Sequence, residues 1–336
     1  LIDAGLEIIL LTDDALVDSI NDRFGRPGLV IEGLRVDQAE AYFKKQHNSI
    51  QWWLDFLRRA GASRRINLEA VNGFVSQVQD ISGGRRRRLF PLMKSLLWGV
   101  RQSKFARSQL IRSQNIFTPH IYTELFNRYH PRMVIASTPG WRFDRYLLRE
   151  AAQHGIPTAA VIVGWDNTSS YSLPGAPVNW ISCWSQVQKQ ELILGADWNP
   201  ERVNIGGIPS YDGYFRRQWL VPRPDYFQQH NLDPERKLIS YACSFITFSP
   251  NIQNVEALAS LVATNSLVEP SQLLVRLHPN HFTSEARFIA ERERIQKMAR
   301  ELPHVHVVEP VPLGGRLGYY SGEDMPEKSS MMAYSD

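Results

Sequence analysis

The fold is decided by residues 133–167, which read MVIASTPGWRFDRYLLREAAQHGIPTAAVIVGWDN. The short apolar run 133–137 predicts a strand, and the pattern that follows Asp144 predicts a helix ending at Gly155. The almost wholly apolar run 158–163 predicts a second, buried strand. A strand, a helix and a strand in this order form a right-handed unit with parallel strands, so the stretch predicts an α/β fold.

The same alternation extends over most of the chain. Further apolar runs separated by helical patterns predict strands at 7–11, 180–184, 202–205, 237–243, 273–277 and 305–308. Apolar residues at three- and four-residue steps predict one long helix from Val36 to Gly61. Ser249 followed by Pro250 predicts an N-cap and the first position of another helix.

One segment breaks the pattern and divides the chain. Residues 214–236 contain Pro222 and Pro224, carry mixed charge and show no period, which indicates a linker. We therefore predict two tandem Rossmann-like α/β domains, each a doubly wound parallel sheet, facing a cleft. Residues 1–213 form the first domain, and residues 237–336 form the second.

The composition excludes several classes of protein, and the two chain ends indicate a fragment. The 336 residues are 43% hydrophobic and include only two cysteines, which excludes a disordered chain, a disulfide framework and a four-cysteine zinc module. No apolar run approaches the ~20 residues of a membrane span, which predicts a soluble, cytoplasmic protein. The chain opens without Met, on what resembles a helix's last turn, and closes on a helix with no strand after it. We expect a fragment truncated at both ends, with an incomplete second domain.

Positive charge is concentrated in a helical insertion at about 81–123. This segment holds nine Lys or Arg and no Asp or Glu, although the whole chain has a formal net charge of only +4. Trp98, Phe105 and several leucines are interleaved with the cations. Such a pattern fits the anionic inner surface of a cytoplasmic membrane through residues 85–112, and it equally fits a solvated helix face. No nucleic-acid motif accompanies the charge, so we expect no nucleic-acid partner.

Polar residues follow the predicted strands, where ligands of open parallel sheets bind. In the first domain the loop after 158–163 contains Trp165, Asp166 and Asn167, and the loop after 133–137 contains Thr138 and Gly140. Asp166 has the chemistry of a general base, with Trp165 as a stacking wall. The alternative is an Asx-type turn in which Asp166 and Asn167 bond nearby backbone amides.

The second domain offers a sequence suited to phosphate. Arg276 and His278 lie two apart at the end of a predicted strand, before Pro279 and Asn280, so their side chains share a face. A forked guanidinium and an imidazole suit a phosphate or diphosphate, although a structural histidine before proline is the alternative. Ser244 and Thr247, just before the helix at Ser249, would add donors to the same anion site.

Other chemistries find less support. No Walker A loop, dinucleotide fingerprint or Gly-x-Ser-x-Gly elbow occurs. His304 and His306 alternate on a predicted strand without a third clustered ligand, so we predict no metal site.

The Trp-Asp-Asn loop and the Arg-x-His-Pro strand end, on two tandem α/β domains, resemble GT-B type glycosyltransferases. The sequence is similar in particular to bacterial surface-carbohydrate and CDP-glycerol glycerophosphotransferase-like proteins. Much of the resemblance lies in 155–215, including VNIGGIPSYD at 203–212. The closing EKSSMMAYSD, 327–336, resembles the helix that leads into the family's donor-binding loop.

The resemblance implies transfer of a sugar, or a sugar-like phosphoalcohol, from a nucleotide-activated donor to a hydroxyl, without metal or other cofactor. Asp166 would deprotonate the acceptor, a carbohydrate or lipid-linked molecule of surface polysaccharide synthesis, bound by Trp165, Asn167, Thr138 and Gly140. Residues binding the donor phosphates would be Arg276, His278, Asn280, Ser244 and Thr247, with His278 also catalytic. The loops that usually grip the nucleotide would lie beyond Asp336, so the fragment itself would lack activity if they are required. A UDP-N-acetylglucosamine 2-epimerase-like enzyme and a non-catalytic degenerate GT-B module are the alternatives.

Overall fold

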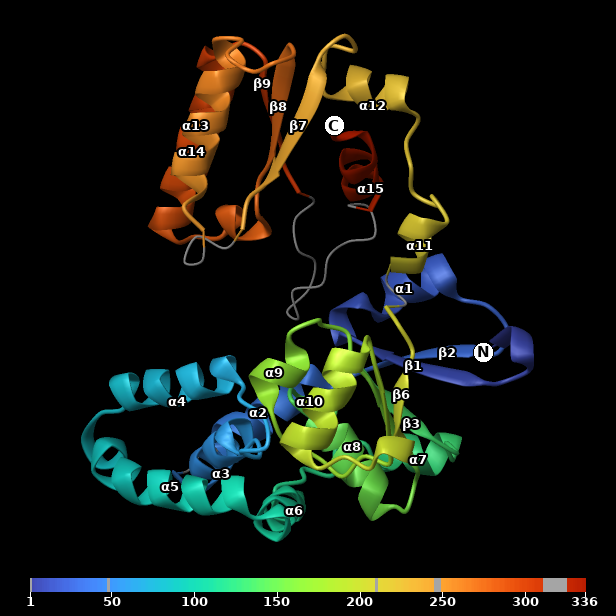
Figure 1. The fold of residues 1–336 in the computed structure, drawn as a ribbon. Helices are drawn as coiled ribbons and strands as arrows, with labels where there is room; N and C mark the ends of the chain where they lie inside the picture. Colours follow the sequence, from blue (N-terminus) through green and yellow to red (C-terminus); the bar gives the residue numbers. More distant parts are fainter. Residues whose placement is uncertain (1, 47–48, 209–210, 245–248, 311–324) are drawn as a thin grey trace. The chain divides into compact units, whose positions relative to one another are not determined.

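The computed structural model describes residues 2–46, 49–208, 211–244, 249–310 and 325–336. The chain divides into two compact units, Leu1–Ser210 (unit 1) and Tyr211–Asp336 (unit 2). Each unit contains parallel strands alternating with helices, which confirms the predicted α/β class with separate Rossmann-like units (Figure 1).

Unit 1 contains a two-stranded and a four-stranded parallel sheet. Its elements are β1 (Ile8–Thr12), α1 (Val17–Phe24), β2 (Leu29–Gly33), α2 (Val36–Gln46), α3 (Ser49–Ala60), α4 (Glu69–Ile81), α5 (Gly84–Gln102), α6 (Lys104–Ser113), α7 (Thr123–Tyr129), β3 (Val134–Ala136), α8 (Asp144–Gln153), β4 (Thr158–Val161), α9 (Asn167–Tyr171), β5 (Trp180–Cys183), α10 (Gln186–Ala196) and β6 (Val203–Ile205). The strand order β3-β4-β5-β6 follows the chain order.

The register of the larger sheet places small and branched side chains against a helix. Ala160 on β4 pairs with Ile181 on β5, which pairs with Val203 on β6. These three side chains form one buried cluster with Leu192 of α10. Alternate residues are buried along β3, β4 and β5, as a sheet with a covered face requires.

The basic insertion is helical and attached to the rest of unit 1 by an aromatic core. Trp53 and Phe56 of α3 pack with Phe90 and Leu97 of α5 and Leu110 of α6. The expected single helix from Val36 to Gly61 is instead two helices, α2 and α3, on either side of residues 47–48, which lie outside the described part.

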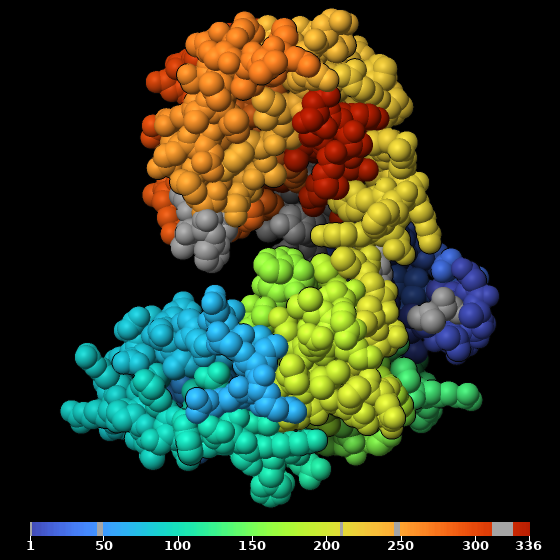
Figure 2. Space-filling model, viewed as in Figure 1, coloured from blue at the N-terminus to red at the C-terminus, as the bar shows by residue number. Residues whose placement is uncertain are grey.

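Unit 2 contains one parallel sheet with helices on both faces. Its elements are α11 (Asp212–Phe215), α12 (Arg223–Gln229), β7 (Lys237–Ala242), α13 (Asn251–Ala263), β8 (Ser271–Arg276), α14 (Ala286–Glu301), β9 (Val305–Val308) and α15 (Met325–Tyr334), in sheet order β7-β8-β9. Leu273 and Val275 pack towards α13 and α14, whereas Leu274 packs towards α12 and α15. Figure 2 shows α15, in red, packed on the surface of this unit. A strand buried on both faces is the expected result of doubly wound packing.

The segment predicted as a linker, 214–236, is part of unit 2. Helix α12 places Tyr226 and Phe227 in the buried cluster that covers one face of β8. Pro224 lies in the first turn of this helix, where a missing backbone N–H costs no hydrogen bond. The prolines of this segment therefore mark the start of a helix within unit 2.

Candidate functional site

The carboxyl end of β8 carries the first candidate cluster, in unit 2. Arg276 is the last residue of β8 and is buried. Leu277 continues the ladder, since its N–H donates to the carbonyl of Val308 at 3.0 Å. Leu277 packs with α13 and α14, so Arg276 lies on the opposite face, like Leu274. Its positive charge therefore lies at the sheet edge, on the side covered by α12 and α15.

His278 follows this strand end and has a defined tautomer. Its Nδ1 accepts a hydrogen bond from the Asn280 backbone N–H at 3.1 Å. The neutral ring therefore carries its proton on Nε2, as a donor. Burial lowers the pKa of His278, and the nearby His281 and Arg276 lower this pKa further. The effect of Arg276 agrees with the predicted proximity of the two side chains. Asn280 contributes its backbone amide to this arrangement.

A buried network, which the sequence did not indicate, holds the His278 turn in place. His281 accepts the His278 N–H on Nδ1 at 3.0 Å. The His281 Nε2 contacts Glu291 Oε1 of α14 at 2.9 Å, and the Asn251 side-chain amide of α13 donates to the same oxygen at 2.7 Å. All three side chains are buried. The strand-end turn is therefore tied to two helices by charge-assisted hydrogen bonds.

Of the predicted donors before α13, the structure describes Ser244 but not Thr247. The Ser244 N–H donates to Asn251 Oδ1 at 3.1 Å, and the Asn251 amide returns a bond to the Ser244 carbonyl at 2.9 Å. The backbone of Ser244 thus adjoins the same network as His278. The prediction that Ser249 caps the following helix is wrong, because α13 begins after Pro250 and has no side-chain cap. The Ser249 hydroxyl contacts Tyr241 instead, at 3.4 Å. Thr247 lies outside the described residues.

The loop after β4 carries the second cluster, in unit 1. Trp165 leaves 76% of its surface exposed, and Asp166 and Asn167 beside it are half-buried. The buried side chain of Gln188 on α10 holds this loop, since its amide donates to the carbonyls of Gly164 and Trp165 at 3.0 and 2.9 Å. An exposed indole on a fixed backbone is a surface on which a sugar ring can stack.

The Asx-turn alternative for this loop is wrong. Helix α9 begins after Asp166, whose carboxylate makes no capping bond to the helix. Its recorded side-chain contact is with the Asn167 amide at 3.5 Å. The turn is held by backbone carbonyls instead, since the Asp166 carbonyl accepts from the Ser169 hydroxyl and the Ser170 N–H. The carboxylate is therefore not used to build the turn.

Thr138 and Gly140 lie inside the fold rather than on an open loop. The buried Thr138 hydroxyl donates to the Asp144 carboxylate and accepts the Trp141 N–H at 3.0 Å. Gly140 has φ +81°, and a Cβ there would lie 2.9 Å from the Ala176 amide nitrogen. This geometry favours a structural role for both residues. Asp144, which the sequence placed just before this helix, is the first residue of α8, and its carboxylate accepts the Thr138 hydroxyl.

Among the described residues, no group of three or more His, Cys, Asp or Glu side chains is arranged to hold a metal ion. Within the same residues, each helix falls short of the length and apolar character needed to cross a membrane.

Comparison with known proteins gives similarity to solved structures alone. No family model and no curated protein matches the chain. The chain is similar to UDP-N-acetylglucosamine 2-epimerase from Rickettsia bellii, at 12% identity and TM-score 0.35, over 60% of this chain and 50% of that one. It is also similar to Methanocaldococcus jannaschii UDP-GlcNAc 2-epimerase, solved with UDP-GlcNAc and UDP, at 9% identity and TM-score 0.35, over 61% and 56%. The chain thus spans about half the length of these proteins.

Proposed function

We propose that the protein is a glycosyltransferase that moves a sugar, or a sugar-like phosphoalcohol, from a nucleotide-activated donor to a hydroxyl acceptor in bacterial surface carbohydrate synthesis. The observation that carries the proposal is the tautomer of His278. The Asn280 N–H donates to its Nδ1, so the neutral ring carries its N–H on Nε2, close to the Arg276 guanidinium at a parallel-strand end. Nitrogen donors of this kind bind phosphate oxygens.

In the proposed donor site, unit 2 binds the phosphates. The Arg276 guanidinium and the His278 Nε2–H donate to the phosphate oxygens, and the backbone around Ser244 and Asn280 borders them. When the bond between the sugar carbon and the phosphate oxygen breaks, its electron pair stays on the leaving phosphate. The donors stabilise this negative charge as it develops. Because these donors neutralise the leaving group, we propose a reaction that needs no metal.

In the proposed acceptor site, unit 1 supplies the base. Asp166 accepts the proton of the acceptor hydroxyl as the oxygen forms its bond to the sugar carbon. Trp165 offers its exposed face to an acceptor sugar ring, and Asn167 lies beside it. This assignment is supported by a carboxylate that makes no capping bond to α9. The proposal includes a peripheral contact of residues 85–112 with an anionic membrane, which would give access to a lipid-linked acceptor.

Nucleotide titration tests the donor site directly. We would titrate UDP, GDP, CDP and CMP by calorimetry into the wild type, into His278→Ala and into the control His304→Ala. His304 precedes β9 at the opposite end of the same sheet, since its carbonyl accepts from Leu273 N–H. We expect one nucleotide to bind, and His278→Ala to weaken it about 10- to 100-fold, as loss of a hydrogen bond to a charged group does. If His278→Ala and His304→Ala bind the nucleotide with equal affinity, or if the wild type binds none of the four nucleotides, the proposed donor site is wrong.

Turnover then distinguishes a transferase from the other classes. Asp166→Asn should keep nucleotide affinity and lower transfer by about 10²- to 10⁴-fold, the usual contribution of a general base. An epimerase would release an epimerised nucleotide sugar without any acceptor. A binding module would hold nucleotide or carbohydrate and release no product.

A further inference from the structure

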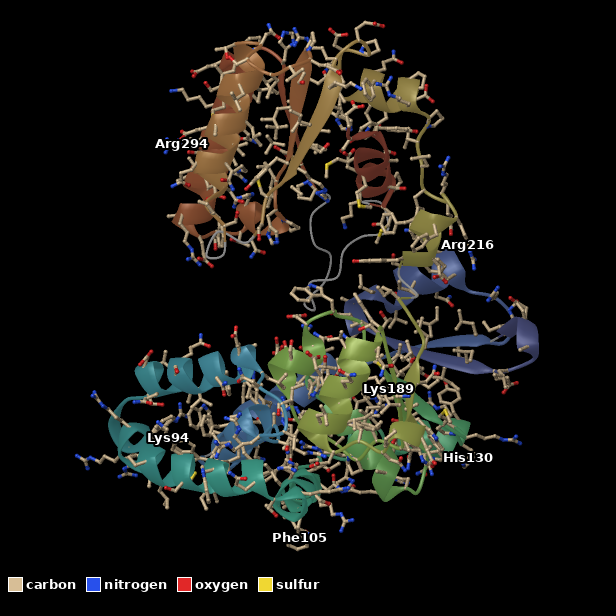
Figure 3. All side chains as sticks on the ribbon, viewed as in Figure 1. Lys94, Phe105, His130, Lys189, Arg216 and Arg294 are labelled. Atoms are coloured by element: carbon tan, nitrogen blue, oxygen red, sulfur yellow. The ribbon has the colours of Figure 1, made fainter. Side chains whose placement is uncertain are left out.

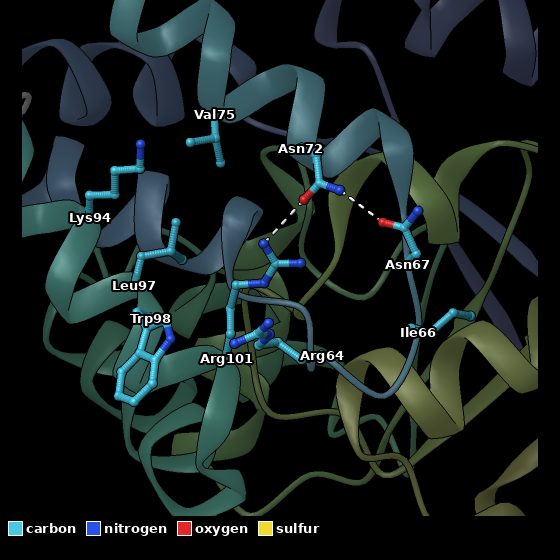
Figure 4. A pocket seen from close by; sticks show the side chains of 9 residues that line it. All are labelled: Arg64, Ile66, Asn67, Asn72, Val75, Lys94, Leu97, Trp98 and Arg101. Atoms are coloured by element: carbon cyan, nitrogen blue, oxygen red, sulfur yellow. Dashed lines mark hydrogen bonds between the residues drawn. The ribbon is translucent and has the colours of Figure 1, made fainter.

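A basic pocket lies in unit 1, between α4 and α5 and the segment that precedes α4 (Figure 4). Its volume is about 700 Å³, and three cations line it, Arg64, Lys94 and Arg101. No carboxylate is among its lining residues. Neither the proposed donor site nor the proposed acceptor site uses these side chains. A cavity lined by cations without a carboxylate is suited to an anion.

Two of these cations are held close together. Arg101 donates from Nε to the Ala62 carbonyl and from Nη1 to Asn72 Oδ1, both at 3.1 Å. Partial burial lowers the pKa of Arg101, and the neighbouring charge of Arg64 lowers it further. The fold therefore tolerates a repulsion between like charges at this point. A bound anion would remove that repulsion, which makes the pair a preorganised anion site.

The same helix carries apolar side chains into solvent. Lys94, Trp98 and Arg101 lie at steps of four and three residues along α5, so they share a helix face at the pocket. The Trp98 indole is 62% exposed, and Leu92 on the outer surface of α5 is 56% exposed.

Phe105 on α6 is 72% exposed and extends away from the helices (Figure 3). Binding of a soluble phosphate ester would not require exposed apolar side chains beside the pocket. Exposed leucines and aromatic rings beside cations are typical of a surface in contact with the bilayer interface.

We infer that this pocket binds the phosphate headgroup of an anionic lipid at a membrane surface. Arg64, Lys94 and Arg101 hold the phosphate, while Trp98, on the same face of α5, enters the interface. The inference rests on the membrane contact included in the proposed function and gives it a defined site. It does not depend on the chemistry of unit 2, so nucleotide binding and lipid binding can fail separately.

The test compares two pairs of substitutions that remove the same charge. Arg64→Gln with Lys94→Gln alters the pocket, and Lys45→Gln with Arg132→Gln alters exposed cations of unit 1 that lie outside 85–112 and do not line the pocket. Binding is measured by sedimentation with vesicles of phosphatidylcholine alone and of phosphatidylcholine mixed with phosphatidylglycerol. We expect binding to the mixed vesicles only, about 25-fold weaker for the pocket pair, since one cation near an anionic surface contributes about fivefold. The second pair should lose less than about threefold, because it acts only through screened long-range attraction.

A third variant separates the apolar contribution from the charge. Trp98→Phe keeps all three cations and removes the indole, so it should also weaken binding to the mixed vesicles. Subtracting the Trp98→Phe emission spectrum from that of the wild type isolates the fluorescence of Trp98. The maximum of this difference spectrum should shift to shorter wavelength when the mixed vesicles are added. Equal losses for the two charge pairs would overturn the pocket and leave only diffuse attraction. Binding of inorganic phosphate to the wild type without any vesicle binding would identify a soluble ligand and overturn the lipid assignment.

Discussion

Substitution of Glu291 tests whether the buried network holds the strand-end turn. Glu291 Oε1 accepts from the Asn251 amide at 2.7 Å and contacts the His281 Nε2 at 2.9 Å. Glu291→Met removes both bonds and leaves two buried donors without this acceptor. Each hydrogen bond to a charged group contributes about 1.5 to 3 kcal/mol, and burial of the methionine offsets part of the loss, so we expect about 3 kcal/mol of destabilisation. Glu291→Gln keeps an oxygen at the same position and should cost about 1 kcal/mol.

The two cysteines make the assay specific to each unit. Cys243 is buried in unit 2 in the cluster of α13 and α14, and Cys183 is buried in the sheet of unit 1. Burial, with the charge of Glu291, raises the pKa of the Cys243 thiol to about 12, so native unit 2 resists alkylation. A short pulse of iodoacetamide at increasing urea, followed by mass spectrometry, gives one unfolding midpoint for each thiol.

For Glu291→Met the Cys243 midpoint should fall by roughly 1 to 2 M urea, given about 2 kcal/mol per M for a unit of this size. The Cys183 midpoint serves as the internal reference and should not move. Equal midpoints for Glu291→Gln and Glu291→Met would show that the hydrogen bonds to Oε1 contribute nothing. A Cys243 shift below roughly 0.3 M for Glu291→Met would refute the network as a support of the site.

Three further outcomes are expected. Gly140→Ala should destabilise unit 1 by about 2 to 4 kcal/mol, because the new Cβ would clash with Ala176 at a residue with positive φ. Gly155→Ala is the control, since φ is +71° there but the Cβ would enter open space, and it should cost about 1 kcal/mol. The urea midpoint of Cys183 alkylation measures both losses of stability. Gln188→Leu should speed hydrogen exchange at 164–168 about tenfold or more, since it removes both bonds that hold the Trp165 loop, and unchanged exchange would contradict that role. The Asn280 N–H on Nδ1 and the lowered pKa of His278 both oppose its protonation, so His278 should bind phosphate as a neutral donor. The pH profile of nucleotide affinity from 7.5 to 6 should therefore have the same slope in the wild type and in His278→Gln, and a slope that His278→Gln abolishes would contradict this.

Sequence patterns predicted the parallel α/β units because buried strands leave strong local signals. The apolar runs of β4 and β8 each identified a strand within a few residues of its bounds. Proline was harder to interpret. In 214–236 it marked the first turn of α12, and in α5 Pro91 lies inside a helix that continues to Gln102. Tertiary packing of Phe90 and Leu97 compensates there for the lost hydrogen bond, which no local pattern shows.

The candidate site was predictable only in part. A rule about strand ends placed Arg276, His278 and Asp166 at the right edges of their sheets. The same rule also selected Thr138 and Gly140, but their loop is buried and packs against residues 173–176. Gln188 was missed because its function is to donate to backbone carbonyls that are 23 and 24 residues away. Contacts between segments far apart in the sequence produce no regular spacing by which they could be predicted.

His281 and Glu291, which the sequence analysis missed, determine what the predicted residue His278 can do. A histidine at a strand end can be a donor, an acceptor or a cation, and the sequence HPNH at 278–281 does not choose among them. The choice follows from His281, which takes the His278 N–H and shapes the turn in which Asn280 reaches Nδ1. Glu291 in turn accepts from His281 Nε2, which fixes the His281 tautomer that can accept that N–H. Disruption of the bond between Glu291 and His281 should therefore alter the pH profile of nucleotide binding even where unit 2 stays folded, as Glu291→Gln can show.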